Sequence, residues 1–303
     1  MPVRTPDRVV VRVPAKLNLH LSVGPLRADG FHELTTVFHA VSLTDEVTVR
    51  PADRLTVSVT GEGAEQVPTD STNLAVRAAA LLAEHTGHAP GVAISIRKGI
   101  PVAGGCAGGS ADAAATLIAC NVLWGTEQGS DTLAGLAARL GSDVSFCLQG
   151  RTALGTGRGE QLTPVLGRGS YAWVLALAHE GLSTPAVYRR LDDDRKSAPT
   201  VAADPSDVLA ALRRGDATLL GRALHNDLQP PAVALRPALQ TLLNLGDELG
   251  ALGGIVSGSG PTVAFLARDP DHADELAVQL AGSDVCRAVR RADGPVAGAR
   301  VVG

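Results

Sequence analysis

The chain has 303 residues, 27 basic and 31 acidic side chains, a net charge of −4 and a pI near 6.1. Its 45% hydrophobic and 19% charged residues predict a folded chain with a buried core. The acidic balance argues against a nucleic-acid-binding protein, which needs basic side chains to neutralise phosphates. No apolar run approaches the roughly 18 residues of a membrane span, and the first residues lack the apolar segment of a secretion signal. We therefore expect a cytoplasmic protein without membrane or nucleic-acid partners.

Cysteine and lysine usage adds two constraints. The four cysteines lie far apart and form no CxxC pair and no zinc-spaced cluster with histidine: Cys106, Cys120, Cys147 and Cys286. Lysine occurs at three positions against 24 arginines: Lys16, Lys98 and Lys196. The cysteine pattern fits a reducing compartment, and the scarcity of lysine makes each lysine a position to inspect.

In the first half, apolar residues alternate over 9–23 and predict two strands separated by a break at Pro14 and Ala15. The next elements are expected as two or three short strands within 37–59, a helix over 73–85, a strand over 92–96, a helix that Gly125 ends, a helix over 132–140 and a strand with a turn over 152–159.

In the second half, helices dominate. The pattern predicts a strand over 173–178, helices near 185–191, 206–214, 216–224 and 236–249, a strand over 262–267, a helix over 270–281 and a strand over 285–289. Strands mixed with helices, followed by a helix-rich half, indicate an α+β chain of two domains, which we divide into residues 1–166 and 167–303.

The densest glycine cluster is PVAGGCAGGSADAAA, residues 101–115, which runs directly into a helical pattern. Glycine lets backbone N–H groups approach a ligand closely, and the first turn of a helix has unpaired N–H donors. Together they predict a phosphate-binding loop, with a plain strand-to-helix turn as the alternative. It is not a Walker loop, because no lysine follows the glycines.

Several other positions are candidates for chemistry. Lys16 and Asn18 are two residues apart in a predicted strand and therefore project from the same face. Asp143 follows a helix-ending glycine, where an acidic side chain more often forms a turn. Phe31 and His32 follow Asp29-Gly30 and present a ring and an imidazole side by side. A second glycine-rich loop spans 254–261.

These segments resemble a known family. PAKLNL, PVAGGCAGGSADAA and GGIVSGSGPT resemble the three motifs of the GHMP small-molecule kinases, and the resemblance runs from about Val9 to the C-terminus. RADGFHEL, LGSDVSF and GLSTPAVY are similar to the member that phosphorylates the 2-hydroxyl of a cytidine-diphosphate-linked methylerythritol on the route to isoprenoid precursors. The resemblance implies an N-terminal domain like domain two of ribosomal protein S5, a ferredoxin-like C-terminal domain, and the use of ATP with Mg²⁺.

The resemblance also implies roles for individual residues. Asp143 matches the family's general base, and Lys16 matches the lysine that keeps this carboxylate ionised and orients the hydroxyl. As the loop's only hydroxyl, Ser110 is the candidate ligand of Mg²⁺. The positions that match substrate-contacting residues are Asn18, Phe31, His32, Thr184, Gly258, Ser259 and Gly260. The positions that match the ATP loop are Pro101, Val102, Ala103, Gly104, Gly105, Cys106, Ala107, Gly108, Gly109, Ser110 and Ala111.

The sequence departs from the family pattern at four of these positions. Cys106 replaces a commonly aliphatic residue, and we interpret it as a small apolar filler rather than a reactive thiol. Phe31 replaces the usual tyrosine, and Ala107 and Ala111 stand where a glycine and a serine are common. Two alternative functions remain open. One is a GHMP kinase for another small alcohol, such as homoserine or mevalonate, against which the segments GFH and GSDV argue. The other is an RNA-binding protein with a ribosomal type of fold, which the net charge disfavours.

Overall fold

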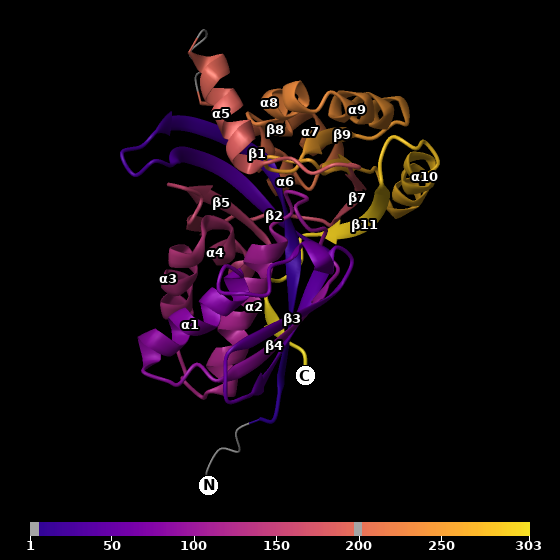
Figure 1. The fold of residues 1–303 in the computed structure, drawn as a ribbon. Coiled ribbons are helices and arrows are strands. Elements are labelled where there is room, and N and C mark those ends of the chain that lie inside the picture. The colour runs from indigo at the N-terminus through magenta and orange to yellow at the C-terminus, as the bar shows by residue number, and fades with distance from the viewer. Residues whose placement is uncertain (1–5, 197–201) are drawn as a thin grey trace.

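The structure is a computed structural model that describes residues 6–196 and 202–303. Two sheets with their helices form a lower and an upper part (Figure 1). The elements up to residue 164 are β1 (Val9–Leu26), β2 (His32–Pro51), β3 (Thr56–Gly61), the 3₁₀ helix η1 (Ala64–Gln66), α1 (Leu74–Thr86), β4 (Val92–Lys98), α2 (Gly108–Leu123), α3 (Ser130–Leu140), α4 (Ser142–Gln149), β5 (Thr152–Thr156) and β6 (Gln161–Pro164).

The remaining elements are more helical, as expected. They are β7 (Tyr171–Leu177), α5 (Thr184–Arg195), α6 (Ser206–Arg214), α7 (Ala217–Ala223), β8 (His225–Asn226), α8 (Gln229–Leu235), α9 (Ala238–Glu248), β9 (Gly253–Val256), β10 (Val263–Leu266), α10 (Pro270–Ala281), β11 (Ala288–Gly294) and β12 (Arg300–Val301). The α+β fold class is confirmed. The last large strand, β11, begins three residues after the start predicted for it.

The first sheet has the order β12-β1-β2-β4-β3, and β5 and β8 pair with β2 and β1. The sequence predicted a break in the first strand, but β1 is continuous. Its ladder with β2 shifts register between Pro14 and Ala15, so a β-bulge accommodates the proline without ending the strand. The several short strands predicted within 37–59 are also wrong in part, because β2 runs unbroken for 20 residues along β1.

The second sheet is antiparallel, with the order β11-β7-β10-β9. Numbered along the chain, its strands lie in the order 4-1-3-2, with helices between the first and second strands and between the third and fourth. This is the ferredoxin-like arrangement that the resemblance implied. Strand β7 is buried on both faces, which explains its unbroken apolar sequence YAWVLAL.

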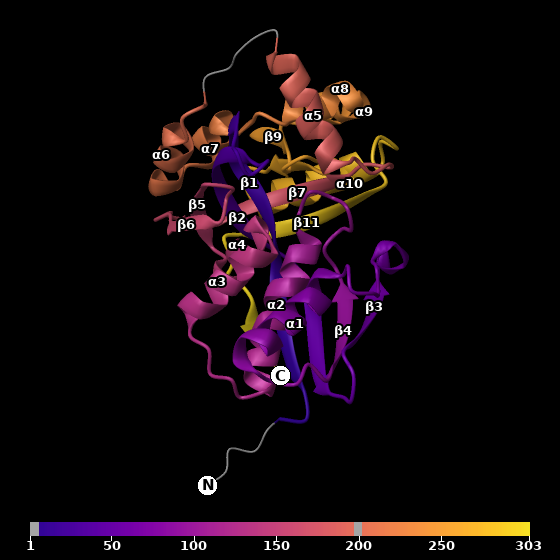
Figure 2. The same cartoon turned by 60° about the vertical axis from the view of Figure 1, so that its left-hand side comes forward.

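The two faces of β7 belong to two different cores. Trp173 and Leu175 pack into the core of the first sheet, α1 and α2, while Val174 and Ala176 pack against α5 and α8–α10. The two parts are therefore joined by shared apolar burial, and Figure 2 shows the second sheet lying directly above α2 and α4. The division predicted between residues 166 and 167 falls in the connection from β6 to β7, and it stays a prediction.

Candidate active site

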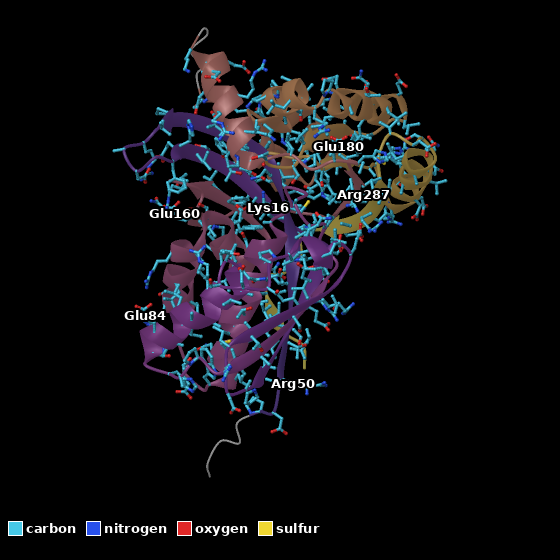
Figure 3. All side chains as sticks on the ribbon, viewed as in Figure 1. Lys16, Arg50, Glu84, Glu160, Glu180 and Arg287 are labelled. Carbon is cyan, nitrogen blue, oxygen red and sulfur yellow. The ribbon has the colours of Figure 1, made fainter. Side chains whose placement is uncertain are left out.

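A cavity of about 460 Å³ opens where the two parts meet. Its walls come from β1, β2, the loop after β4, the start of α2, Asp143 of α4, Thr184 of α5 and the loop after β9. In Figure 3 Lys16 lies at this meeting point, far from Arg50 and Glu84 at the lower end of the molecule. The three sequence motifs therefore converge on one cavity although they are up to about 240 residues apart.

The glycine-rich loop forms one wall of this cavity. Ala107 has a left-handed backbone and precedes α2, whose first residues Gly108, Gly109 and Ser110 line the space. A Cβ on Gly105 would lie 2.2 Å from the Ser257 carbonyl oxygen, so this glycine permits close contact between the two glycine-rich loops. The backbone N–H groups at the start of α2 are free to bind an anion.

Nine of the eleven residues predicted to bind ATP line the cavity, from Pro101 to Gly105 and from Ala107 to Ser110. The other two, Cys106 and Ala111, are fully buried behind the loop. Burial raises the pKa of the Cys106 thiol, which agrees with its reading as a small apolar filler.

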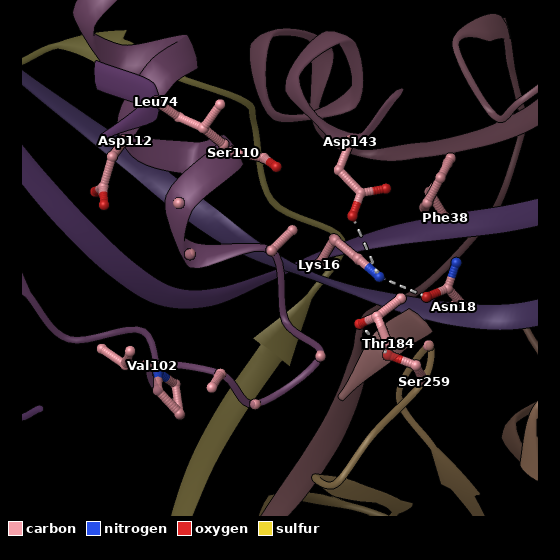
Figure 4. Close-up of a pocket in the computed structure, with 18 of the residues that line it drawn as sticks. Lys16, Asn18, Phe38, Leu74, Val102, Ser110, Asp112, Asp143, Thr184 and Ser259 are labelled. Carbon is pink, nitrogen blue, oxygen red and sulfur yellow. Dashed lines mark hydrogen bonds and ion pairs between the residues drawn. The ribbon is translucent and has the colours of Figure 1, made fainter. Parts of the chain in front are cut away.

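The predicted catalytic pair is brought together. The Nζ atom of Lys16 lies 3.7 Å from Oδ2 of Asp143 and donates to Oδ1 of Asn18 at 2.6 Å (Figure 4). Lys16 is almost fully buried, whereas the Asp143 side chain is one-third exposed at the cavity wall. Asp143 was expected in a turn, but it lies in the first turn of α4, where the helix dipole favours a carboxylate.

Sequence reasoning missed two residues of β2 that orient this pair. Thr36 accepts a hydrogen bond from Nδ2 of Asn18 at 2.8 Å and donates to the His20 carbonyl, which directs Oδ1 of Asn18 toward Lys16. The Lys16 ammonium also lies 5.8 Å from the centre of the Phe38 ring. Side chains alternate between the two faces of a strand, so Thr36 lies on the same face of β2 as Phe38. This alternation is the only sequence signal that could have identified Thr36 as a site residue.

The second glycine-rich loop covers Lys16 from the upper part. A Cβ on Gly258, whose φ is +56°, would lie 3.3 Å from Nζ of Lys16. Ser259 and Thr184 share a hydrogen bond of 2.7 Å between their hydroxyls, which ties the loop to the start of α5. Gly260 is buried and turns the chain toward β10 with φ of +78°. All four predicted positions therefore lie at or directly behind this side of the cavity.

A second cavity of about 570 Å³ adjoins the first, and both are lined by Ser110, Asp143 and Thr184. Phe31, which is 54% exposed, and His32 lie in the second cavity. Asp143 thus stands at the junction of two spaces, as expected of a group that acts between two substrates.

The aromatic end of this second cavity holds more than the predicted pair. The His32 ring stacks on Tyr188 with centroids 5.4 Å apart, and its nitrogens lie 2.9 Å from the Gly24 carbonyl and 3.2 Å from the Asp192 carboxylate. The Arg158 guanidinium lies 5.1 Å from the centre of the Phe31 ring. Tyr188 ends the segment GLSTPAVY, from which only Thr184 was selected as a site residue, and nothing in the local sequence of Arg158 distinguishes it from an ordinary turn residue.

A buried ion cluster underlies the start of α2. Nζ of Lys98 donates to Oδ2 of Asp112 at 2.7 Å and to Oδ2 of Asp45. Burial raises the pKa of Asp112 to about 8, since desolvation and the nearby Asp45 charge outweigh the stabilising Lys98. Burial disfavours the Lys98 ammonium, but the two carboxylates outweigh this and raise its pKa. The cluster thus places one ammonium between two buried carboxyl groups, and the raised pKa favours the neutral form of Asp112.

Ser110 is the residue that the sequence predicted as a metal ligand. No group of three or more His, Cys, Asp or Glu side chains in residues 6–196 and 202–303 could hold a metal ion. Ser110 lines both cavities and is half-buried. Ser110 supplies the only hydroxyl of residues 101–111 at this cavity wall.

Models of known protein families match both halves of the chain. A family model of the GHMP kinases N terminal domain matches residues 73–151, and one of the GHMP kinases C terminal matches residues 208–284. The fold is thus that of a GHMP kinase. The chain belongs, within this class, to the 4-diphosphocytidyl-2-C-methyl-D-erythritol kinase family.

That family is shown by relatives of nearly full length. The 4-diphosphocytidyl-2-C-methyl-D-erythritol kinase of Rhodococcus jostii is 56% identical, over 98% of this chain and 96% of the relative. That of Mycobacterium tuberculosis H37Rv is 59% identical, over 97% of this chain and 93% of the relative.

Solved structures agree. A crystal structure of 4-(cytidine 5'-diphospho)-2C-methyl-D-erythritol kinase has a TM-score of 0.75 at 36% identity, covering 93% of this chain and 98% of that one. A homoserine kinase from Cytophaga hutchinsonii has a TM-score of 0.77 at 20% identity, covering 100% of this chain and 99% of that one, and shows the shared fold alone. No helix in the described part of the chain is long and apolar enough to cross a membrane.

Proposed function

We propose that the chain transfers the γ-phosphoryl group of ATP to the 2-hydroxyl of 4-diphosphocytidyl-2-C-methyl-D-erythritol, a step in making isoprenoid precursors. The observation that carries this proposal is the position of Asp143. It stands at the junction of the two cavities, 3.7 Å from a buried lysine, with the phosphate-binding helix start on one side and the aromatic residues on the other.

The residues of the first cavity account for phosphoryl transfer. Transfer of this kind depends mainly on positioning and charge stabilisation, which backbone N–H groups and a lysine supply. The start of α2 binds phosphate oxygens, Lys16 stabilises negative charge near the transferred group, and Asp143 accepts the proton of the attacking hydroxyl. Ser110 would help to hold Mg²⁺, which would supply positive charge that offsets part of the charge of the phosphates.

The second cavity supplies the binding site for the cytidyl group. Cytosine has a flat π-face and a polar edge, so it is recognised by ring stacking together with hydrogen bonds. Phe31 and Tyr188 offer ring faces. The His32 nitrogens lie near the Gly24 carbonyl and the half-exposed Asp192 carboxylate, so the cytosine edge would replace Asp192 at Nε2 of His32. The missing hydroxyl at Phe31 removes a hydrogen bond that tyrosine could make, but it leaves the stacking surface.

The proposed cytosine-binding role of His32 and Phe31 can be tested by substitution. We expect His32→Ala to raise KM for the cytidyl substrate about 5- to 150-fold, because a polar edge loses its partner at a cost of roughly 1–3 kcal/mol. Phe31→Ala should act in the same direction through lost stacking. Steady-state kinetics with each substrate varied in turn measures both effects.

Phe31→Tyr is the matched control, since it keeps the ring and should leave KM nearly unchanged. Because His32 also bonds Gly24 and Asp192, melting curves on the same preparations are needed. Lower melting temperatures with an unchanged KM in both alanine variants would mean that the two residues only shape the turn after β1.

The phosphate site makes a separate prediction. A Cβ on Gly108 would lie 3.1 Å from Nζ of Lys98 and 3.4 Å from Cγ2 of Ile100, so Gly108→Val would crowd the helix start where phosphate binds. We expect the Kd for ATP to rise at least about tenfold, as for the loss of one good hydrogen bond. Gly129→Val is the matched control, because Gly129 also precedes a helix but has open space around it. Equal ATP affinity in the two folded variants would contradict the phosphate-binding role.

The function as a whole is tested by a coupled assay of ADP release. ATP, Mg²⁺ and the cytidyl substrate should give turnover, whereas homoserine and mevalonate should give little or none. Turnover with either of these alcohols at a comparable kcat/KM would assign the chain to a different GHMP kinase activity.

A further inference from the structure

The cluster of Lys98, Asp45 and Asp112 is a buried charged group that the proposed chemistry does not use. The three side chains are between 0% and 6% exposed, although Lys98 and Asp112 lie in the wall of the first cavity. Removing three ionisable groups from water is costly, and apolar residues of similar size would often fill such a site with equal or greater stability. Stability alone therefore gives little reason for these residues at this place.

Their connections explain what they hold. Lys98 ends β4 immediately before the glycine-rich loop, and Asp112 lies in α2 immediately after it. The bond of 2.7 Å between Nζ of Lys98 and Oδ2 of Asp112 therefore ties together the two ends of this loop, which are 14 residues apart. Lys98 also lies directly under the helix start, 3.1 Å from the position of a Cβ on Gly108.

Asp45 fixes the same loop from β2. One of its carboxylate oxygens accepts hydrogen bonds from the backbone N–H groups of Gly99 and Ile100, at 2.7 and 2.9 Å, and the other accepts from Lys98. Both carboxylate oxygens of Asp45 therefore accept hydrogen bonds. Asp112 differs, because its second oxygen, Oδ1, is buried without a hydrogen-bond partner.

We propose that Lys98, Asp45 and Asp112 are positioning residues that hold the glycine-rich loop in its ATP-binding shape and keep the underside of the phosphate site electrically neutral. This inference rests on the proposed function. A single positive charge on Lys98 balances Asp45, and Asp112 serves as a neutral acceptor for a second ammonium hydrogen. The raised pKa of Asp112 supports this division of roles between the two carboxyl groups. A second full negative charge would oppose the binding of a triphosphate above it.

The proposal predicts an asymmetry between two substitutions at one position. Asp112→Asn keeps an acceptor for Lys98 and is neutral, so the Kd for ATP should stay within about threefold of the parent value. Asp112→Ala removes that acceptor while Lys98 keeps Asp45, so the fold is retained and the Kd for ATP should rise about 5- to 150-fold. The kcat at saturating ATP and the KM for the cytidyl substrate should change little in either variant.

Calorimetry with ATP alone and the complete chain measures the Kd, and steady-state assays separate KM from kcat. Asp227→Asn is the control, because Asp227 also pairs with a partly buried arginine, Arg195, but lies away from the loop. It should lower the melting temperature without changing the Kd for ATP. Lys98→Arg provides an independent variant, since it keeps the charge but moves the donors and should also raise the Kd.

Three results would overturn the inference. The first is parent-like ATP affinity in folded Asp112→Ala and Lys98→Arg, and the second is an equal loss of ATP affinity in Asp112→Asn and Asp112→Ala. The third is a parallel rise in KM for both substrates, which would mean that the whole site has loosened. Failure of the proposed function looks different, because the parent chain itself would then not bind ATP or not phosphorylate the cytidyl substrate.

Discussion

Asp143→Asn should lower kcat by at least about 10²-fold, the scale of a lost general base, while the Kd for ATP stays near the parent value. Asparagine has nearly the same shape as aspartate and fits the first turn of α4, but it cannot accept the proton of the attacking hydroxyl. ATP affinity should survive because the proposed phosphate site is the loop and the start of α2, and within residues 6–196 and 202–303 Asp143 makes no hydrogen bond or ion pair with this site. Turnover of ATP and calorimetry on the same preparation measure the two quantities.

Asp131→Asn is the matched control for this prediction. Asp131 also lies in the first turn of a helix, α3, but it is exposed and does not line either cavity. Its amide variant should retain the parent kcat. If Asp143→Asn also retained the parent kcat, Asp143 would have no role as a base. Its position between the two cavities would then no longer support the proposed reaction.

The sequence predicted the parts of this site that local patterns encode. The period of a strand placed Lys16 and Asn18 on one face, and the hydrogen bond of 2.6 Å between them follows from that spacing. Glycine density ahead of an apolar helix predicted a phosphate-binding loop. The helix begins within the glycine cluster, at Gly108, and the binding of phosphate there stays a prediction. In the strand and in the glycine-rich loop alike, a few adjacent residues were enough for the prediction.

Other parts depend on contacts that no local pattern encodes. Helix α4 was missed because it has eight residues between two glycines, so its sequence reads as a turn. The scarcity of lysine drew attention to Lys98, but its partner Asp45 lies 53 residues away on another strand. Such a pair is fixed by the register between β2 and β4, and register is set by tertiary packing rather than by the sequence of either strand.

Lys16→Met should lower kcat about 10²- to 10³-fold, the scale seen when one preorganised group that stabilises transition-state charge is removed. Methionine keeps the length of the side chain and its contact with the Phe38 ring, so the buried strand should remain folded. The loss should come from two causes. The charge near the transferred phosphoryl group disappears, and both Asn18 and Asp143 lose the ammonium that orients them, at 2.6 and 3.7 Å.

The double variant Lys16→Met with Asp143→Asn distinguishes a coupled pair from two independent residues. Residues that act as a unit are strongly non-additive, so the double variant should be little slower than the slower of the single variants. Lys196→Met is the control, because Lys196 is exposed at the end of α5 and pairs only with Asp193 among the described residues. If the two losses in kcat multiplied instead, Lys16 would act on the phosphoryl group without positioning the base, and the ion pair between them would be incidental to catalysis.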